Sequence, residues 1–310
     1  MPGGVQIGVA DVVIHLQKTS VAATGGVPGA EGYGGVDSAW TEIAADVYIR
    51  RYAALDQTLG LVVGGERCLV VDTGRDEVHG AELAAAVRTV TPLPWTVMIT
   101  HAHWDHFFGT ASFLPSPIWA HGHCRNVVAN RADEMRERGL RYYAERNDLT
   151  SSAALRTAKA IEPTDVFTDQ VMIDLGDRKV MLWHLGRGHT DNDVIVDVSE
   201  EAVVFTGDLV EQGAPPAIGS DAYPAEWPPT LDRLLALQPQ VVVPGHGWPV
   251  DVAFVRTQRE ELETVAALIR AVSSGELSKA EAISRSPYPK EATLPALEHA
   301  TRRENQPTMP

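Results

Sequence analysis

The sequence predicts a single α/β domain in which two β-sheets are covered by helices. Two sets of apolar, β-branched runs are separated by a charged, alanine-rich stretch, and further helix-like patterns follow the second set. This order of elements fits one domain better than two independent ones. The 310 residues, of which 44% are hydrophobic, have the composition of an ordinary globular chain that can bury a large core.

The first half of the chain begins with a segment, residues 1–44, that contains the glycine-rich loop TGGVPGAEGYGG. In TLGLVVGGERCLVVDTG (58–74), two apolar runs flank a Gly-Gly-Glu-Arg turn, which is typical of a β-hairpin. Residues 77–90 space their larger apolar side chains for one face of a helix. WTVMIT (95–100) and PIWAH (117–121) are expected to be strands.

The second half starts with a charged, alanine-rich helical insertion at about 124–160. The runs VMIDL, KVMLWHL, DVIVDV and AVVFTG predict a second set of strands, and a proline-rich loop at 211–229 follows them. We expect a helix near 230–238, the strand VVVPG, and a helix near 252–272. The catalytic domain is therefore expected over 45–275, and residues 276–310 form a polar tail that is expected to be loosely ordered in part.

The stretch ITHAHWDHFFG (99–109) places four ligand-type side chains directly after a predicted strand. His101 and His103 point to the same side if the chain stays extended, because side chains alternate along a strand, so both imidazoles reach one ion. Asp105 and His106 face elsewhere where the chain turns into a helix, and they are expected to serve a second ion. One short motif is thereby divided between two metals.

This motif is incomplete by itself, because zinc normally takes about four ligands. Further ligand-type residues follow other strand-like runs: His189 in GRGHTDND, Asp208 in VVFTGDL and His246 in VVVPGHG. Each has a glycine close by, which allows the backbone to turn sharply as the side chain is presented. Loops at strand ends are the expected place for a site on a rigid sheet.

These motifs, H-x-H-x-D-H, GHT, TGD and PGHG in that order, resemble those of the metallo-β-lactamase-fold hydrolases. The resemblance covers roughly residues 45–250. It implies an αββα sandwich of two mixed β-sheets flanked by helices. It also implies the ligand sets: His101, His103 and His189 for a first metal, Asp105, His106 and His246 for a second, and Asp208 as the bridge between them.

The implied chemistry is hydrolysis by a metal-bridging hydroxide. Coordination lowers the pKa of water from near 16 to about 7, so hydroxide is available at neutral pH to attack a carbonyl carbon. Asp105 is the predicted catalytic side chain, which steers the hydroxide or passes a proton to the leaving group. Asp72, in VVDTG, is predicted to orient the ligands from behind, and His184 is predicted to support them, although a structural role for His184 is equally open.

The fold alone does not assign the reaction. The predicted function is a dinuclear, metal-dependent hydrolase that cleaves a small ester, lactone, thioester or amide, with two Zn2+ per chain and manganese or iron as alternatives. The rival is a mononuclear iron persulfide dioxygenase that uses His101, His103 and Asp208. A non-catalytic metal-binding protein ranks third.

The net charge and the absence of apolar targeting segments in the sequence limit the classes of partner and the location that we expect. The formal charge is −15 with no continuous basic stripe, which argues against nucleic acid. No signal-like N-terminus and no membrane-length apolar run occurs, so the expected location is cytoplasmic and the expected partner a small-molecule substrate, with the oligomeric state open.

Tyr223 and Trp227 are the predicted substrate contacts, although aromatic residues also simply rigidify such loops. The arginines of the insertion are expected to form a mixed-sign solvated helix face, with an anion-recognising lid as the alternative.

Overall fold

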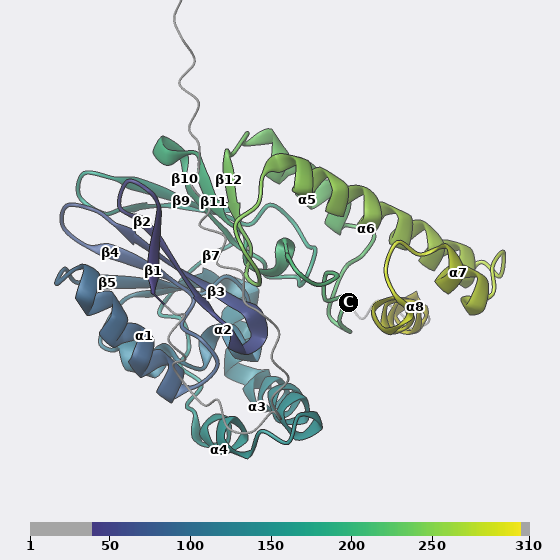
Figure 1. Ribbon diagram of the computed structural model, residues 1–310, viewed down its shortest axis with the longest axis horizontal. Coiled ribbons are helices and arrows are strands. Elements are labelled where there is room, and N and C mark those ends of the chain that lie inside the picture. Colours follow the sequence, from purple (N-terminus) through teal and green to yellow (C-terminus); the bar gives the residue numbers. More distant parts are fainter. Residues whose placement is uncertain (1–38, 305–310) are drawn as a thin grey trace, which may run out of the picture. The chain divides into compact units, whose positions relative to one another are not determined.

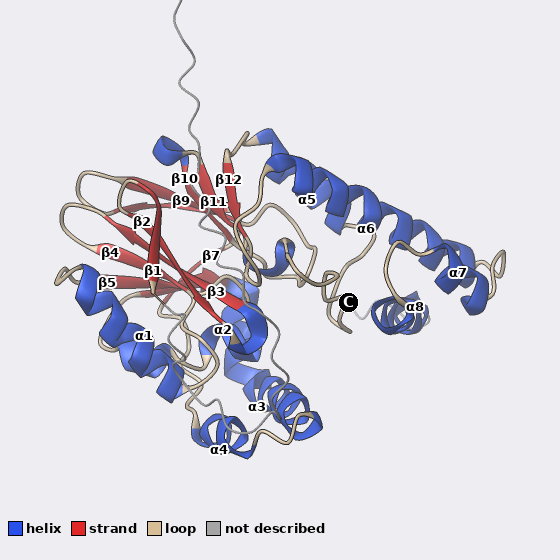
Figure 2. Ribbon diagram, in the orientation of Figure 1, coloured by secondary structure: helices blue, strands red, loops and turns tan. Residues whose placement is uncertain are grey.

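The computed structural model describes residues 39–304, and side chains up to residue 298, all within one compact unit. Within this unit two β-sheets face each other, and helices cover their outer faces (Figures 1 and 2). The predicted αββα arrangement is confirmed. The glycine-rich loop lies outside the described residues.

The first sheet has seven strands in sequence order, antiparallel as far as the fourth and parallel from there on. The predicted hairpin joins the third and fourth strands. The strand Trp40–Ala44 pairs with its neighbour at the sheet edge, so the sheet begins ahead of the predicted boundary at residue 45. The strands are β1 (Trp40–Ala44), β2 (Val47–Tyr52), β3 (Gln57–Val63), β4 (Cys68–Val71), β5 (Trp95–Met98), β6 (Ile118–His121) and β7 (Asp165–Phe167).

The second sheet has five strands in the order β12-β11-β10-β9-β8. Only the pair β11 and β12 is parallel. The strands are β8 (Gln170–Asp174), β9 (Lys179–Trp183), β10 (Ile195–Val198), β11 (Val203–Phe205) and β12 (Val241–Val243).

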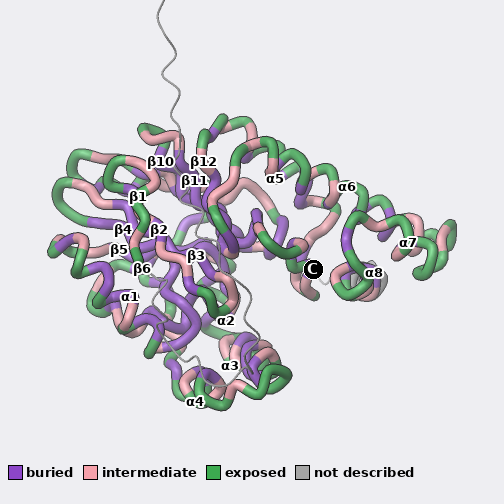
Figure 3. Tube along the Cα trace, viewed as in Figure 1, coloured by how far each residue is buried: buried purple, intermediate pink, exposed green. Residues whose placement is uncertain are grey.

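Three apolar clusters hold the layers together, and neighbouring strand residues divide between them. In β4, Cys68 and Val70 face the helices on the first sheet, whereas Leu69 and Val71 face the second sheet. Both faces of the central strands are therefore buried (Figure 3). This explains why these strands are continuous apolar runs rather than alternating ones.

Helices α1 (Glu77–Val90), α2 (Trp104–Phe107), α3 (Gly122–Glu145) and α4 (Leu149–Thr157) contribute to the cluster on the first sheet. Helices α5 (Trp227–Ala236), α6 (Val252–Ser273), α7 (Lys279–Arg285) and α8 (Lys290–Glu304) contribute to the cluster on the second. Short 3-10 helices occur at Ala54–Asp56, Thr110–Phe113, Ser199–Glu201 and Gly207–Leu209. In the described part of the chain, none of the helices combines the length and apolar character needed to cross a bilayer.

Much of the C-terminal segment, which the sequence predicts to be a polar tail that is loosely ordered in part, is helical. Residues Lys279–Arg285 and Lys290–Glu304 form helices α7 and α8. Ala282, Tyr288 and Leu297 are buried in the cluster on the second sheet. A capping box at Ser278 and Glu281 defines the start of α7. The sequence did not indicate these two helices, because the few apolar residues are separated by charged ones and by proline, which hid the helical spacing. Residues 305–310 of the predicted tail lie outside the described residues.

Candidate metal centre

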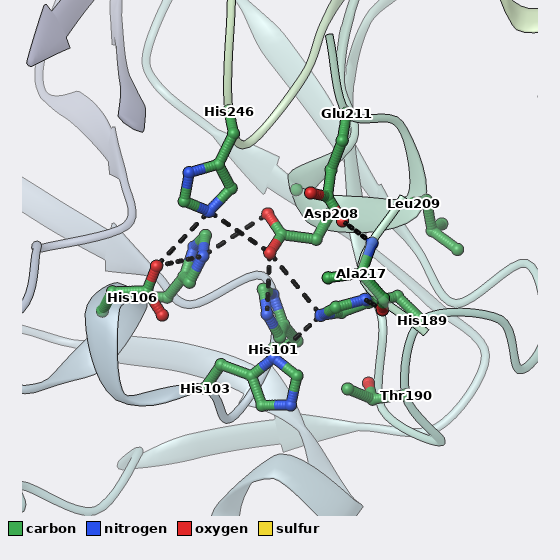
Figure 4. A network of polar contacts seen from close by, with 12 residues as sticks. His101, His103, His106, His189, Thr190, Asp208, Leu209, Glu211, Ala217 and His246 are labelled. Atoms are coloured by element: carbon green, nitrogen blue, oxygen red, sulfur yellow. Dashed lines mark hydrogen bonds and ion pairs between the residues drawn. The ribbon is translucent and has the colours of Figure 1, made fainter. Parts of the chain in front are cut away.

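All seven predicted ligands lie at one edge of the sandwich, where strands end. His101 and His103 follow β5, His189 lies in the loop between β9 and β10, Asp208 follows β11 and His246 follows β12. Asp105 and His106 lie in α2, directly after the first two. The structure brings them together in two groups, within each of which the ligand atoms lie within 4.8 Å of one another: His101, His103, His189 and Asp208, and then Asp105, His106 and His246 (Figure 4).

Asp208 lies between the two groups. Its Oδ2 is 3.6 Å from His101 Nε2 and 3.5 Å from His189 Nε2, both in the first group. The same carboxylate reaches the second group, with 3.4 Å from Oδ1 to His106 Nε2 and 3.4 Å from Oδ2 to His246 Nε2. This is the placement required of a carboxylate that bridges two ions.

Each of the five imidazoles has an acceptor behind it that fixes its tautomer. Since a neutral imidazole carries one N–H, the other nitrogen of each ring presents a lone pair to the centre. The N–H bonds run from His101 Nδ1 to Thr100 Oγ1 (3.1 Å), His103 Nε2 to Asp221 Oδ2 (3.1 Å), His106 Nδ1 to Asp72 Oδ2 (2.9 Å), His189 Nδ1 to the Ala217 carbonyl (3.1 Å) and His246 Nδ1 to the Leu55 carbonyl (2.8 Å).

The inward-facing atoms fit a cation. Buried His101 Nε2, His106 Nε2 and Asp208 Oδ1 have no hydrogen-bond partner, which is costly unless something positive lies between them. The lone pairs of His103 Nδ1 and His189 Nε2 face each other across 2.8 Å. A donor set of imidazole nitrogen and carboxylate oxygen suits zinc and similar divalent ions.

The electrostatics of the centre point the same way. Burial opposes protonation of His106 and His246, yet the carboxylates of Asp208 and Asp105 raise the pKa of both imidazoles well above the ordinary value. The two carboxylates therefore attract positive charge into the second group. In the first group, burial and the neighbouring His103 lower the pKa of His189 to about 3, so its ring stays neutral and available as a ligand.

Asp72 lies behind the centre, as predicted, and contacts Thr100, the neighbour of His101, as well as His106. Its carboxylate accepts hydrogen bonds from Thr100 N at 2.7 Å and Thr100 Oγ1 at 2.8 Å, besides the one from His106. Asp72 has the left-handed φ of 62°. This conformation turns the carboxylate at the end of β4 back towards β5, and rigid hydrogen bonding then orients His101 and His106 together.

Two motif glycines are required by close approach. A Cβ on Gly245, in PGHG, would lie 1.9 Å from Asp208 Oδ1. Gly207, in TGD, has φ +50°, and a Cβ there would lie 2.7 Å from Thr100 Oγ1. A larger residue at either position would displace the bridging carboxylate or the threonine that supports His101.

Sequence reasoning missed the side chain that supports His103. Asp221, in the proline-rich loop, accepts the His103 Nε2 hydrogen bond and is itself held by Arg138 of α3, at 2.8 and 3.0 Å. Although burial opposes it, the charges of His103 and Arg138 hold the pKa of Asp221 far below its usual range. No motif surrounds this aspartate, and only its position in a loop expected near the site gave a signal.

Glu211 was also missed. Its Oε1 accepts a 2.8 Å hydrogen bond from Ala217 N, and the carbonyl of Ala217 accepts from His189, so the carboxyl group supports a metal-facing histidine through one residue. Burial and the nearby Asp208 raise the pKa of Glu211 to about 8. Figure 4 places this side chain beside Asp208.

Comparison with known proteins agrees with this geometry. A model of the metallo-beta-lactamase superfamily matches residues 54–246. The chain belongs to this superfamily. It is 31% identical to the metallo-beta-lactamase type 2 of Bacteroides fragilis over 44% of the chain and 53% of that protein. It is 25% identical to the human acyl-coenzyme A thioesterase MBLAC2 over 60% of the chain and 71% of that protein.

The solved metallo-beta-lactamase from Pontibacter korlensis superposes with a TM-score of 0.56 at 21% identity, covering 72% of this chain and 98% of that one. At this identity the likeness supports the metallo-β-lactamase fold alone. The chain spans about half to two thirds of the length of the two type 2 lactamases it matches, from Bacteroides fragilis and Bacillus cereus. The predicted membership of the superfamily is confirmed.

The remaining predicted site residues of this metallo-β-lactamase-superfamily chain, Trp227, Tyr223 and His184, have different outcomes. Trp227 is wrong as a substrate contact, because it is buried in α5, donates from Nε1 to the Leu209 carbonyl and packs against the ring of His189 at 5.6 Å. Tyr223 lines a pocket of about 140 Å³ that includes His103, so substrate contact there stays a prediction. Among the described residues, His184 forms no hydrogen bond with a predicted metal ligand; it donates from Nδ1 to the carbonyl of Asp193, in the loop that carries His189.

Proposed function

We propose that this protein is a dinuclear metal-dependent hydrolase that cleaves a small carbonyl substrate, an ester, lactone, thioester or amide. One observation supports this most directly: five tautomer-fixed imidazoles and the carboxylates of Asp105 and Asp208 converge in two adjoining groups. In the mononuclear dioxygenase alternative His106 and His246 bind no metal, although each is oriented by a hydrogen bond to its Nδ1, as the other three histidines are by bonds to one ring nitrogen.

The residues divide the work of hydrolysis. Two divalent ions, zinc in our proposal, supply Lewis acidity and make water acidic enough to ionise near neutral pH. Asp208 holds the two groups at a fixed separation. Burial raises the pKa of Asp105, but the nearby His106 and His246 outweigh this effect and lower the pKa to about 2. Asp105 is therefore an ionised carboxylate at neutral pH. We assign it the acceptance of the proton from the attacking water and its delivery to the leaving group.

The substrate is proposed from the pocket and the relatives together. The pocket beside His103 holds about 140 Å³ and is lined by both apolar and polar side chains, which suits a small acyl group with a polar function. The relatives include one named as a metallo-beta-lactamase and one named as an acyl-coenzyme A thioesterase, which supports the proposal of an acyl substrate. A small-molecule substrate rather than nucleic acid, and a cytoplasmic location, remain our proposals.

The test combines metal content with turnover. Protein purified without added metal is expected to contain close to two zinc ions per chain and to hydrolyse one class among lactones, thioesters, aryl esters and cephalosporins. Asp208→Ala should lower both the metal content and the turnover. Asp232→Ala, which removes an exposed carboxylate paired with Arg259 on the outer helices, should change neither. One iron per chain, with oxygen uptake on glutathione persulfide, would instead identify a dioxygenase.

A further inference from the structure

A second and larger hollow lies outside the metal centre. It holds about 670 Å³, within the range of pockets that bind whole small molecules. Its walls come from the end of β6 and the start of α3, the loop after β9, and the first turns of α5. The lining residues are His121, His123, Thr168, His184, Gly186, Arg187, Asp191, Ala225, Glu226, Pro229, Thr230 and Arg233.

This cavity adjoins the proposed active site. Asp191 lines both the larger cavity and the 140 Å³ pocket that contains His103. Asp191 follows the ligand His189 by two residues, in the same loop. β6, which ends at His121, is the parallel neighbour of β5, which leads to His101. A molecule with one end at the metal centre therefore has room for its other end in this cavity.

The three histidines of the cavity do not form another metal site. Both ring nitrogens of His121 have backbone partners, the Thr168 carbonyl at 3.1 Å and the His123 amide at 3.2 Å. His184 stacks on His121 with ring centroids 4.3 Å apart and ring planes at 30°, and rings stacked face to face do not direct their lone pairs to one point. Among the described residues, the groups able to hold a metal do not include them.

The charges of the lining leave one cation without an acidic partner. Arg187 and Glu226 form a two-point ion pair, at 2.6 and 2.8 Å, so that glutamate is neutralised. Asp191 lies 3.5 Å from His123 Nδ1. Arg233 donates from Nη1 to the Leu185 carbonyl, and in the described part of the chain it has no carboxylate within 4.0 Å.

The loop after β9 is shaped to admit this arginine. Gly186 has φ +130°, and a Cβ there would lie 2.7 Å from Arg233 Nη1 and 2.8 Å from Thr230 Oγ1. Any other residue at 186 would push the guanidinium away from the loop. Arg233 is exposed, and with one N–H of Nη1 bound to the Leu185 carbonyl its guanidinium keeps up to four further donors, in a fixed fork that matches carboxylate and phosphate oxygens.

We propose that this cavity binds an anionic oxygen group, a phosphate or a carboxylate, on the part of the substrate remote from the bond that is cleaved, with Arg233 as its principal contact. The placement of that group within the substrate rests on the proposed hydrolase function, whereas binding of the anion does not. His123 and His184 line the same cavity as Arg233, as does Arg187, which is paired with Glu226.

The test is calorimetric titration of the purified, metal-loaded protein with phenyl phosphate, benzoate and benzyl alcohol. Phenyl phosphate or benzoate should bind, and whichever binds more tightly identifies the anion. Arg233→Glu should weaken that binding by about tenfold or more, the effect of one charge-assisted contact. Arg256→Glu, a matched charge reversal at an exposed arginine of α6 that does not line the cavity, should leave it unchanged.

Three results separate the inference from the proposed function. Anion binding that survives in Asp208→Ala but is lost in Arg233→Glu supports the cavity, even if the protein proves to lack hydrolase activity. Binding lost in Asp208→Ala and kept in Arg233→Glu would place the anion on the metals and overturn the inference. Equal affinity for benzyl alcohol, or unchanged anion binding in Arg233→Glu, would also overturn it.

Discussion

The support of His103 by Asp221 and Arg138 makes a prediction with a defined size. Asp221→Ala removes the acceptor that fixes the His103 tautomer and leaves the Arg138 guanidinium without its main partner. Loss of a carboxylate behind a metal-binding histidine typically weakens metal affinity by about 10- to 100-fold. We expect this loss for the first of the two proposed metals, which His101, His103 and His189 would hold, while the second is retained.

The cost in stability follows from partial burial. The Arg138 and Asp221 side chains are 20% and 23% exposed, so the pair is intermediate between an exposed and a buried ion pair. An exposed pair contributes about 0–1 kcal/mol to stability, and breaking a buried pair costs about 3–5 kcal/mol. Glu134 still pairs with Arg138 at 3.2 Å, which softens the loss. We expect about 2 kcal/mol and a fall of about 5 °C in Tm.

The pH dependence of this effect has a definite sign. The folded protein holds the pKa of Asp221 far below its ordinary value, so its ionised form stabilises the fold above the ordinary pKa near 4, and this is lost only as pH falls through the lowered value. From pH 5 to 8 the ionisation of Asp221 itself therefore adds no pH dependence to the stability difference between the wild type and Asp221→Ala. Although burial opposes it, Asp221 also raises the pKa of His103, so in the metal-free protein this difference should be larger at pH 5 than at pH 8.

Competition with a chromophoric chelator measures each metal affinity, and thermal unfolding measures stability. Asp232→Ala is the control, because it breaks a comparable two-point pair with Arg259 on the outer helices, with 52% of the aspartate exposed. Metal affinity should stay at the wild-type value in this variant. If Asp221→Ala lowered Tm as expected but bound both metals normally, the carboxylate would be purely structural and the reasoning refuted.

Three further predictions concern the ligand loop, the core and the histidine cavity. Gly245→Ala should displace Asp208 and lower the metal content, measured by elemental analysis, whereas Gly122→Ala, where a Cβ meets only an ordinary 3.8 Å contact, should not. Trp227→Ala should cost about 3–5 kcal/mol in urea unfolding, because the indole is wholly buried, and a loss below about 1 kcal/mol would contradict its place in the core. Burial and the neighbouring histidines lower the pKa of His121 to about 4, so the unfolded chain binds more protons and stability should rise with pH between about 4 and 6.5. His121→Asn should flatten that rise in unfolding curves, and an unchanged slope would assign it to other groups.

The fold and the ligand set were predictable for physical reasons. Strands buried on both faces are continuous apolar runs, and side chains that bind metal must leave them at sharp glycine-containing turns, so both leave local marks in the sequence. Trp227 left such a mark too: with Leu231 and Leu234 it has the spacing of one apolar helix face, all three buried in α5. Adjacent prolines suggested an exposed loop, but proline is well tolerated in the first turn of a helix.

The supporting residues could not be predicted in the same way. Asp221 lies 118 residues from His103, and Arg138 lies 83 residues from Asp221, so the contacts exist only after the sandwich has formed. Neither position carries a local pattern, because an aspartate in a loop and an arginine on a charged helix are ordinary surface residues.

The insertion helix α3 shows why charge pattern alone is ambiguous there. Arg131 and Glu134 pair with about half of each side chain exposed, which matches the predicted solvated, mixed-sign face. Arg138, two turns further along the same face, is mostly buried against Asp221. The same helix therefore has a solvent-exposed ion pair at Arg131 and, two turns later, a mostly buried ion pair that contacts the metal centre. Since Arg138 orients His103 through Asp221, α3 helps to hold His103 in place. The same helix packs Tyr142 and Tyr143 against Trp104 of α2, so changes in the packing of α3 should reach the site through both contacts.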